Sequence, residues 1–307
     1  MKLIRLTDRV WIYPYEEKRD RPNLGYIRGD EMSMAVDAGH SGEHVREFYK
    51  ALEEEGLPLP SLTVLTHWHW DHTFGMHVVN GSTLASVKTN GHLEKIRDRI
   101  RDEGPEGFLS FDESIRLEYE GGKPVVVTLA DETYTGEKII DLGNCKVRIF
   151  EAQSPHTDDS TLVFAEDEGV LFIGDSACGS FPSGRLEAAP ALKLLEDIRG
   201  TGAKTVIEGH WIPQTLEESA GELELLAAHD LSHNHMEALK ADSVCGCFYC
   251  LKIFSPSESN DWLIADNDCD RLGTAVCPYC CIDSVIGASS GFPITPEFLT
   301  RMKERWF

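Results

Sequence analysis

The residues best suited to chemistry are histidine and aspartate side chains that follow one another in a recognisable order. They are His67, His69, Asp71, His72, His156, Asp175 and His210. The first four fall within six consecutive positions, and a protein core offers too few hydrogen-bond partners for so many buried imidazoles and carboxylates. A divalent cation satisfies them together, because imidazole nitrogen and carboxylate oxygen are both good Zn²⁺ ligands. The pattern therefore predicts a metal site.

A strand must deliver the first four of these residues. Residues 62–66 are apolar enough to form one, and it would end directly before His67. Further strands are expected at 10–14, 24–28, 32–37, 82–87, 125–127, 139–140, 146–150, 162–164, 170–173 and 205–208. Helices are expected at 42–55, 92–102, 187–199 and 217–229. Runs of strands separated by helices predict two sheets with helices outside them.

Two features near the predicted site allow more than one interpretation. Residues 103–123 are rich in Gly and Glu and predict a loop, and we favour a simple insertion over a lid. The side chains that flank the ligands are Trp68, Trp70, His77 and Trp211. Because flanking aromatic residues more often pack than line a pocket, we expect a packing role for them.

Composition bounds the class of protein. The chain has 307 residues, which predicts one large domain or two, and its net charge of −23 opposes binding to a phosphate backbone. It has no apolar run long enough for a membrane span, and charges interrupt its N-terminus too early for a signal peptide. We therefore expect a cytoplasmic protein with no nucleic-acid or membrane partner. A homo-oligomer is compatible with the sequence.

The first ~235 residues resemble the metallo-β-lactamase superfamily. The resemblance rests on the His67 to His72 motif after a strand, on Ser154-Pro155-His156-Thr157, on Phe172-Ile173-Gly174-Asp175, and on Glu208-Gly209-His210. Asp37 also matches the Asp-x-Gly that this superfamily carries after an early strand. The resemblance implies an αββα sandwich, classed as α+β, with the site at one edge.

The resemblance also implies how the ligands divide. One metal would take His67, His69 and His156, and the other would take Asp71, His72 and His210. Asp175 would bridge the two metals. The implied cofactors are two Zn²⁺ ions, with Fe or Mn as alternatives. In the implied reaction, a hydroxide that bridges the metals attacks a carbonyl or phosphoryl centre, and Asp71 and Asp175 are the catalytic carboxylates.

Two positions narrow the implied chemistry. True β-lactamases of this superfamily carry Cys or Ser where this chain has Asp175, which disfavours antibiotic hydrolysis. Redox di-iron members usually carry Glu where this chain has His69, which favours hydrolysis over electron transfer.

Cysteines form the second chemical signal. Cys247, Cys250, Cys277 and Cys280 make two CxxC pairs with 26 residues between them. Four thiolates so spaced are typical of one structural zinc ion, and a cytoplasmic setting opposes the alternative of disulfides. Cys245 and Cys281 adjoin the pairs and compete as ligands, whereas Cys145, Cys178 and Cys269 are expected to be free thiols.

The segment from residue 235 to the end resembles a small family of bacterial cytoplasmic proteins of unassigned function. The matching stretches are 238–240, 245–250, 277–280 and 282–287, and the ending from 294 to 307 also fits. Gly is usual in that family where Cys281 stands here. This resemblance implies a structural zinc-binding domain, of zinc-ribbon or treble-clef type, and no catalytic role.

The sequence therefore predicts two domains, residues 1–235 with a metallo-β-lactamase-like fold and residues 236–307 with a Cys-rich zinc site. The predicted function is hydrolysis of a small ester, thioester, lactone or phosphodiester by a di-metal site. Two alternatives remain open, a redox di-iron protein and a non-enzymatic zinc-ribbon interaction protein on a hydrolase scaffold.

Overall fold

The computed structural model describes residues 1–264 and 273–307, which fall into two compact units. The first unit comprises residues 1–184 and 196–219, and the second comprises residues 185–195 and 220–307. The boundary predicted between residues 235 and 236 lies inside the second unit, because that unit also contains residues 185–195 and 220–235.

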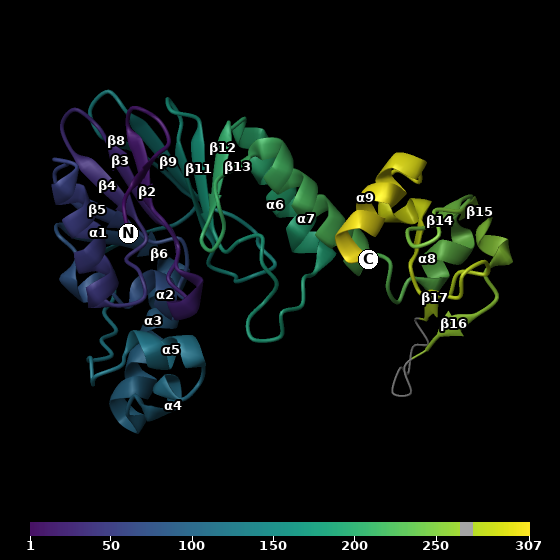
Figure 1. Ribbon diagram of the computed structural model, residues 1–307, viewed down its shortest axis with the longest axis horizontal. Coiled ribbons are helices and arrows are strands. Elements are labelled where there is room, and N and C mark those ends of the chain that lie inside the picture. The colour runs from purple at the N-terminus through teal and green to yellow at the C-terminus, as the bar shows by residue number, and fades with distance from the viewer. Residues whose placement is uncertain (265–272) are drawn as a thin grey trace. The chain divides into compact units, whose positions relative to one another are not determined.

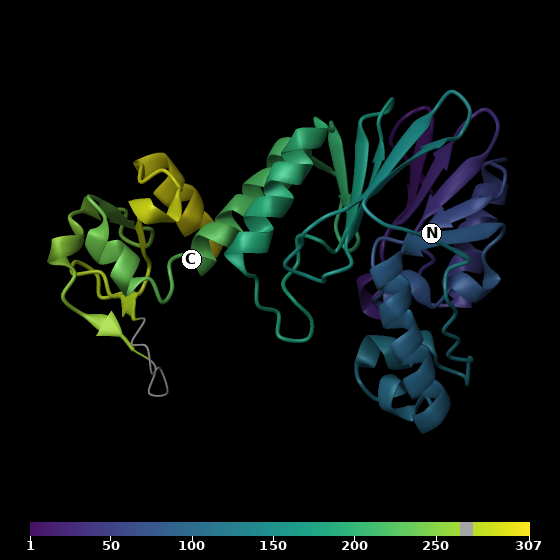
Figure 2. The same ribbon diagram turned by 180° about the vertical axis from the view of Figure 1, so that it is seen from behind.

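Two sheets pack face to face in the first unit (Figures 1 and 2). The first sheet has the order β1-β2-β3-β4-β5-β6-β7 and the second has the order β13-β12-β11-β10-β9-β8. The strands of the first are β1 (Ile4–Arg5), β2 (Val10–Tyr13), β3 (Leu24–Arg28), β4 (Ser33–Val36), β5 (Leu62–Val64), β6 (Ser82–Ser86) and β7 (Glu132–Tyr134). Those of the second are β8 (Glu137–Asp141), β9 (Lys146–Glu151), β10 (Thr161–Ala165), β11 (Val170–Gly174), β12 (Thr205–Glu208) and β13 (Gln214–Thr215).

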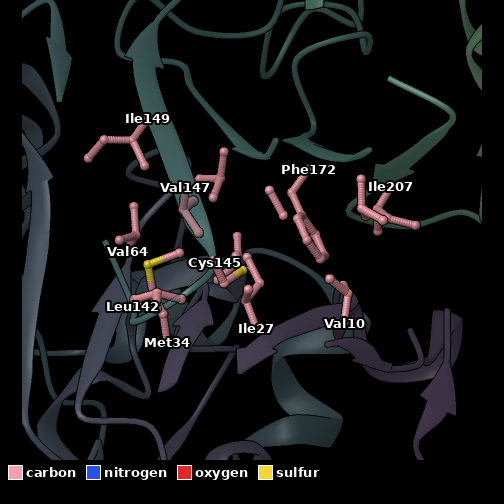
Figure 3. Close-up of a cluster of buried hydrophobic side chains, with 14 of the residues drawn as sticks. Val10, Ile27, Met34, Val64, Leu142, Cys145, Val147, Ile149, Phe172 and Ile207 are labelled. Atoms are coloured by element: carbon pink, nitrogen blue, oxygen red, sulfur yellow. The ribbon is translucent and has the colours of Figure 1, made fainter. Parts of the chain in front are cut away.

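The main core fills the space between these sheets (Figure 3). Strand β2 shows how the sequence builds it, because successive side chains of a strand point to opposite faces. Val10 and Ile12 pack in the core shared with Phe172 of the second sheet. Trp11 and Tyr13 face the other way and pack against a helix. Because both faces of β2 are covered, all four of its residues are buried.

Helices of the first unit are α1 (Gly42–Glu54), α2 (Trp70–Thr73), α3 (Val87–Glu103), α4 (Glu106–Leu109) and α5 (Glu113–Glu118), with short 3₁₀ turns η1 (Glu17–Arg19) and η2 (Met76–Val78). Helix α1 begins where the Ser41 hydroxyl accepts from the His44 amide. Its buried side packs on the outer face of β2, β3 and β4. Helices α6 (Ala188–Thr201) and α7 (Leu216–Asp230) contribute residues to both units.

Most predicted elements are confirmed, and two are wrong. Residues 125–127 form no strand, because Val127 and nearby apolar side chains pack against a cluster that includes Leu93 of α3 instead of joining a sheet. Residues 103–123 are not a featureless loop, because they contain α4 and α5. The predicted α+β class with two packed sheets is confirmed.

The second unit holds the cysteine pairs. Its strands are β14 (Cys245–Cys247), β15 (Ile253–Phe254) and β18 (Val285–Gly287) in one sheet, and β16 (Trp262–Leu263) and β17 (Thr274–Ala275) in another. Its other elements are α8 (Met236–Ala241), α9 (Pro296–Trp306), η3 (Pro256–Glu258) and η4 (Ala288–Ser290). Across the described parts of both units, every helix is too short or too polar to cross a bilayer.

Candidate metal centres

The end of strand β5 delivers the first four predicted ligands to the edge where the two sheets meet. The Leu65 amide donates to Leu84 of the first sheet (3.0 Å), and the Thr161 amide of the second sheet donates to the Thr66 carbonyl (2.7 Å). The chain then turns into the short helix α2, with His69 directly before its first residue. The turn and the helix place His67, His69, Asp71 and His72 on one side, and all four are buried.

Three imidazoles converge in a first group. The His67 Nε2 atom lies 3.1 Å from His69 Nδ1, and His156 Nε2 lies 2.9 Å from the same atom. His156 comes from the loop between β9 and β10, so the second sheet completes a group that the first sheet begins. The three ligand atoms lie within 4.8 Å of one another.

A second group contains Asp71, His72, Asp175 and His210. The Asp71 Oδ2 atom lies 3.1 Å from His72 Nε2 and 2.9 Å from His210 Nε2. His210 follows β12 and Asp175 follows β11, two adjacent parallel strands whose carboxyl ends meet at the same edge. Asp175 Oδ2 lies 3.4 Å from His72 Nε2 and 3.6 Å from His210 Nε2.

One oxygen atom also links the two groups. Asp175 Oδ2 lies 4.0 Å from His67 Nε2 and 3.8 Å from His156 Nε2, so it stands between both sets of imidazoles. This is the position that a carboxylate must occupy to bind two cations at once.

The hydrogen bonds on the far side of each ring decide which nitrogen faces the centre. His72 Nδ1 lies 2.7 Å from Asp37 Oδ2, and His156 Nδ1 lies 2.8 Å from the Gly179 carbonyl. Both partners only accept, so these Nδ1 atoms carry protons and the Nε2 atoms face inward. The Thr66 hydroxyl donates to Asp37 and lies 3.1 Å from His67 Nδ1, which fixes His67 in the same way.

Inward lone pairs at such distances repel one another unless a cation lies between them. The buried atoms His72 Nε2 and Asp175 Oδ1, which belong to the second group, have no hydrogen-bond partner. The inward lone pairs of His67 and His156 both face His69 Nδ1. That atom carries at most one proton, so at most one of the two contacts can be a hydrogen bond. This donor set fits divalent cations of the kind that imidazole and carboxylate bind.

The electrostatics separate the two groups. Burial lowers the pKa of His67 well below its usual value and that of His69 to about 4, so both rings are neutral, as metal binding requires. Burial also lowers the pKa of His210, but Asp175 and Asp71 outweigh it and raise that pKa to about 9. A cation in the second group must therefore displace a proton.

Two residues outside the predicted ligand set hold the His210 turn in place. A side chain on Gly209 would put its Cβ 2.1 Å from Asp175 Oδ1, so only glycine allows this close approach. The Asn23 side-chain amide donates to the carbonyls of Glu208 (2.8 Å) and Trp211 (2.7 Å). Sequence reasoning missed Asn23, since nothing near it in the chain marks its role.

The second unit brings together the four predicted cysteines. Cys247 Sγ lies 3.6 Å from Cys280 Sγ, and Cys250 Sγ lies 3.7 Å from Cys277 Sγ. These distances exclude disulfides, whose sulfurs are about 2.05 Å apart. Sulfurs bound tetrahedrally at about 2.3 Å from a zinc ion would be roughly 3.8 Å apart. The four cysteines therefore fit one tetrahedral zinc ion.

The backbone explains the cysteines next to these pairs. The Leu251 amide donates to the Cys247 carbonyl and the Cys281 amide to the Cys277 carbonyl, so the two CxxC turns are alike. Leu251 and Cys281 both have positive φ, 63° and 61°. Glycine adopts this conformation at least cost, so Leu251 and Cys281 both stand at positions whose backbone favours glycine.

Neither competing cysteine joins the cluster. Cys281 is exposed and Cys245 is buried with its thiol directed at the Phe254 carbonyl, and both lie outside the convergent group. Cys145 and Cys178 have no disulfide partner among the described residues. Cys269 lies outside the described residues.

Aromatic side chains gather beside the histidine and aspartate ligands, which corrects the packing role expected for Trp68 and Trp70. Both line a cavity of about 510 Å³, together with Phe108 and Phe111 from the segment taken as an insertion. His77 and Trp211 lie outside this lining. A second cavity, of about 390 Å³, exposes the ligands themselves. Its lining includes Asp20, whose pKa burial and the charge of Asp71 raise to about 6.

Another cluster of metal-binding residue types lies nearby and was not predicted. It contains His92, Asp158 and Asp159. His92 Nε2 lies 2.7 Å from Asp158 Oδ1, and the Asp158 carboxylate is largely exposed. A surface ion pair of this kind explains the proximity of His92 and Asp158 without a metal, and we assign the cluster no function.

Comparison with known proteins agrees with this geometry. A family model described as the metallo-β-lactamase superfamily matches residues 19–229, which include all seven histidine and aspartate ligands. No curated protein sequence matches the chain significantly.

Two solved structures are similar in fold. A metallo-β-lactamase from Pontibacter korlensis is 16% identical, with a TM-score of 0.54 over 73% of this chain and 98% of that one. The DIM-1 metallo-β-lactamase exposed to ceftazidime is 18% identical, with a TM-score of 0.53 over 74% of this chain and 95% of that one.

Proposed function

We propose a hydrolytic function from one premise: this chain belongs to the metallo-β-lactamase superfamily. Members of this superfamily are typically di-metal hydrolases, and this chain retains two groups of His and Asp residues that could hold the metals. The proposed activity is cleavage of a small ester, thioester, lactone or phosphodiester. The proposed metals are two zinc ions, with a third zinc ion bound by the four cysteines for a structural purpose.

The position of Asp175 is the observation that carries this proposal. Its Oδ2 atom lies within 4.0 Å of Nε2 atoms from His67, His72, His156 and His210, which belong to both groups. A carboxylate so placed can neutralise two cations together. Burying a carboxylate costs free energy, which two bound cations would offset at this position.

When bound, paired divalent cations lower the pKa of water toward neutrality and polarise a substrate oxygen. The residues of this chain would hold the metals and orient the groups around them. Asp37 and the Gly179 carbonyl hold the His72 and His156 rings with Nε2 facing inward. Although burial raises the pKa of Asp71, the His72 and His210 imidazoles hold that pKa well below its usual range. Asp71 is therefore an anion that orients groups around it.

His69 supports hydrolysis over electron transfer, since imidazole stands where redox di-iron members usually carry a carboxylate. It is also the ring that His67 and His156 both face, at 3.1 Å and 2.9 Å. A first site made of three neutral imidazoles suits zinc.

The test is a panel of generic esters, thioesters, lactones and phosphodiesters, assayed with metal-loaded protein. Once one is hydrolysed, Asp175→Ala should abolish turnover and release at least one metal. Asp71→Asn should keep the fold and lower kcat by about 10²-fold or more. Asp8→Asn is the matched control, because it removes the same charge from an exposed carboxylate that pairs with Arg5.

Two outcomes would contradict the proposal. The first is wild-type turnover by both the Asp175 and Asp71 variants, which would place the chemistry elsewhere. The second is a redox-active visible spectrum with bound iron and no hydrolysis of any substrate class in the panel.

A further inference from the structure

An aromatic cavity adjoins the cavity that exposes the metal ligands. The first has a volume of about 510 Å³, and its aromatic walls are Trp68, Trp70, Phe74, Phe108, Phe111 and Phe181. The second, of about 390 Å³, contains His69, Asp71, His156, Asp175 and His210. Trp70, Phe111 and Phe181 line both, so a molecule that reaches the metal ligands also meets the aromatic walls.

The shared residues pack against one another and against a metal ligand. The Phe181 ring lies 5.2 Å from the Trp70 ring, 5.5 Å from the Phe111 ring and 5.2 Å from the His69 ring, centre to centre. Yet Phe111 and Phe181 are 55% and 40% exposed. Large apolar side chains left in water beside a reactive site form a surface that an apolar ligand would cover favourably.

The charges around the ligand cavity restrict the ligand further. Glu17, Asp20 and Asp112 line it in addition to the metal-binding residues, and no Lys or Arg is among the residues that line it, all of which are described. The aromatic cavity has one residue of each sign, Arg99 and Glu103. Apart from the two proposed metal ions, no cation in this lining balances these three carboxylates, so an acidic group of the substrate that lies away from the metals would meet only anions.

We infer that the aromatic cavity binds the apolar acyl group of an uncharged ester or lactone, whose carbonyl lies over the metal ligands. This inference rests on the proposed hydrolytic function and narrows it, because it requires an apolar acyl group and disfavours substrates with an acidic group away from the reacting bond. Segment 103–123 thereby gains a role in specificity, since α4 and the turn after it supply Phe108 and Phe111.

The first experiment measures kcat/KM of the metal-loaded protein for nitrophenyl esters of increasing acyl length. Burying one methylene stabilises a complex by about 0.8 kcal/mol, so each added methylene should raise kcat/KM roughly fourfold until the cavity is full. From acetyl to hexanoyl, the expected increase is about 10²-fold. A succinyl monoester, which carries a carboxylate, should be cleaved at least about tenfold more slowly than the uncharged pentanoyl ester.

Variants locate the effect. Phe111→Ala and Phe181→Ala should lower the hexanoyl-to-acetyl ratio by about tenfold, since each removes an aromatic wall. Both residues are exposed enough that truncation spares the core. Ile139→Ala is the matched control, because Ile139 is an equally exposed apolar residue on β8, outside both cavities, and its ratio should equal that of the wild type.

Octanol binding separates this inference from the proposed function, because octanol is uncharged and contains no hydrolysable bond. Calorimetry should detect binding of octanol but not of ethanol, and Phe111→Ala should weaken it. Octanol binding without hydrolysis of any substrate class in the panel would refute the hydrolytic function and the acyl-ester assignment while locating an apolar site. Ester hydrolysis with no dependence on acyl length, or a preference for the succinyl ester, would overturn the inference and leave the hydrolytic function intact.

Discussion

Replacing Glu118 by Gln should destabilise the first unit and loosen the segment that shapes the aromatic cavity. Glu118 ends helix α5, and its side chain is fully buried against the equally buried side chain of Arg21. The Arg21 Nε and Nη2 atoms lie 2.8 Å and 2.9 Å from the two Glu118 oxygens. This bidentate ion pair joins α5 to the start of the chain, so it holds the segment that carries Phe111.

The magnitude follows from what the substitution leaves behind. Breaking a buried ion pair from one side costs about 3–5 kcal/mol, because the remaining charge is buried without a partner. Here Arg21 Nη1 still lies 3.0 Å from Glu47, and Gln keeps one carbonyl acceptor. We therefore expect Glu118→Gln to lower the free energy of unfolding by about 2–3 kcal/mol.

Urea denaturation followed by circular dichroism measures this change, and hydrogen exchange of the α5 amides tests its location. Glu47→Gln is the matched control, because Glu47 is partly exposed and its loss should cost about 1 kcal/mol or less. The double variant Arg21→Met, Glu118→Leu should recover most of the lost stability, since it removes both buried charges. A cost below about 1 kcal/mol for Glu118→Gln, with unchanged α5 exchange, would refute the reasoning.

Three further predictions concern the metals. Elemental analysis of protein purified without chelator should find about three metal ions per chain, and one or fewer in folded protein would contradict the two-centre arrangement. Replacing Cys247 and Cys277 by Ser should loosen the second unit, because structural zinc supplies folding energy. The first unit should keep its metals, and their loss would show that the units depend on each other. Because Asp175 and Asp71 raise the pKa of His210 to about 9 despite burial, the metal-free ring is protonated at neutral pH and metal affinity should fall as the pH drops below that value. Calorimetry in buffers of different ionisation enthalpy should show proton release on metal binding, and its absence would contradict this charge state.

Local sequence was sufficient wherever a short segment fixes its own geometry. An apolar strand before His67 places the following residues at the carboxyl end of β5, so their convergence could be expected from the spacing alone. The same holds for each CxxC pair, because three residues bring two sulfurs to one turn. The strand expected at 125–127 shows the limit, since apolar residues predict burial but not whether a sheet edge is available to them.

Residue type alone could not show which of several adjacent side chains binds a metal or lines the cavity. Cys281 adjoins Cys280 and has the right chemistry, but its left-handed backbone places it outside the cluster. Trp68 and Trp70 were expected to pack, and they do contact other rings, but the cavity beside them exists only because Phe108, Phe111 and Phe181 come from two other segments. No pattern within any one of these segments indicates the others.

The sequence by itself determined the kinds of donor at each centre, their order along the chain and the two-sheet fold that carries them, because side-chain chemistry and strand periodicity are local properties. The tertiary structure alone decided that Asn23 holds the His210 turn and that segment 103–123 faces the ligands. These contacts join residues up to 188 positions apart. They depend on how two sheets pack against each other, and packing is set by the whole core rather than by any segment of it.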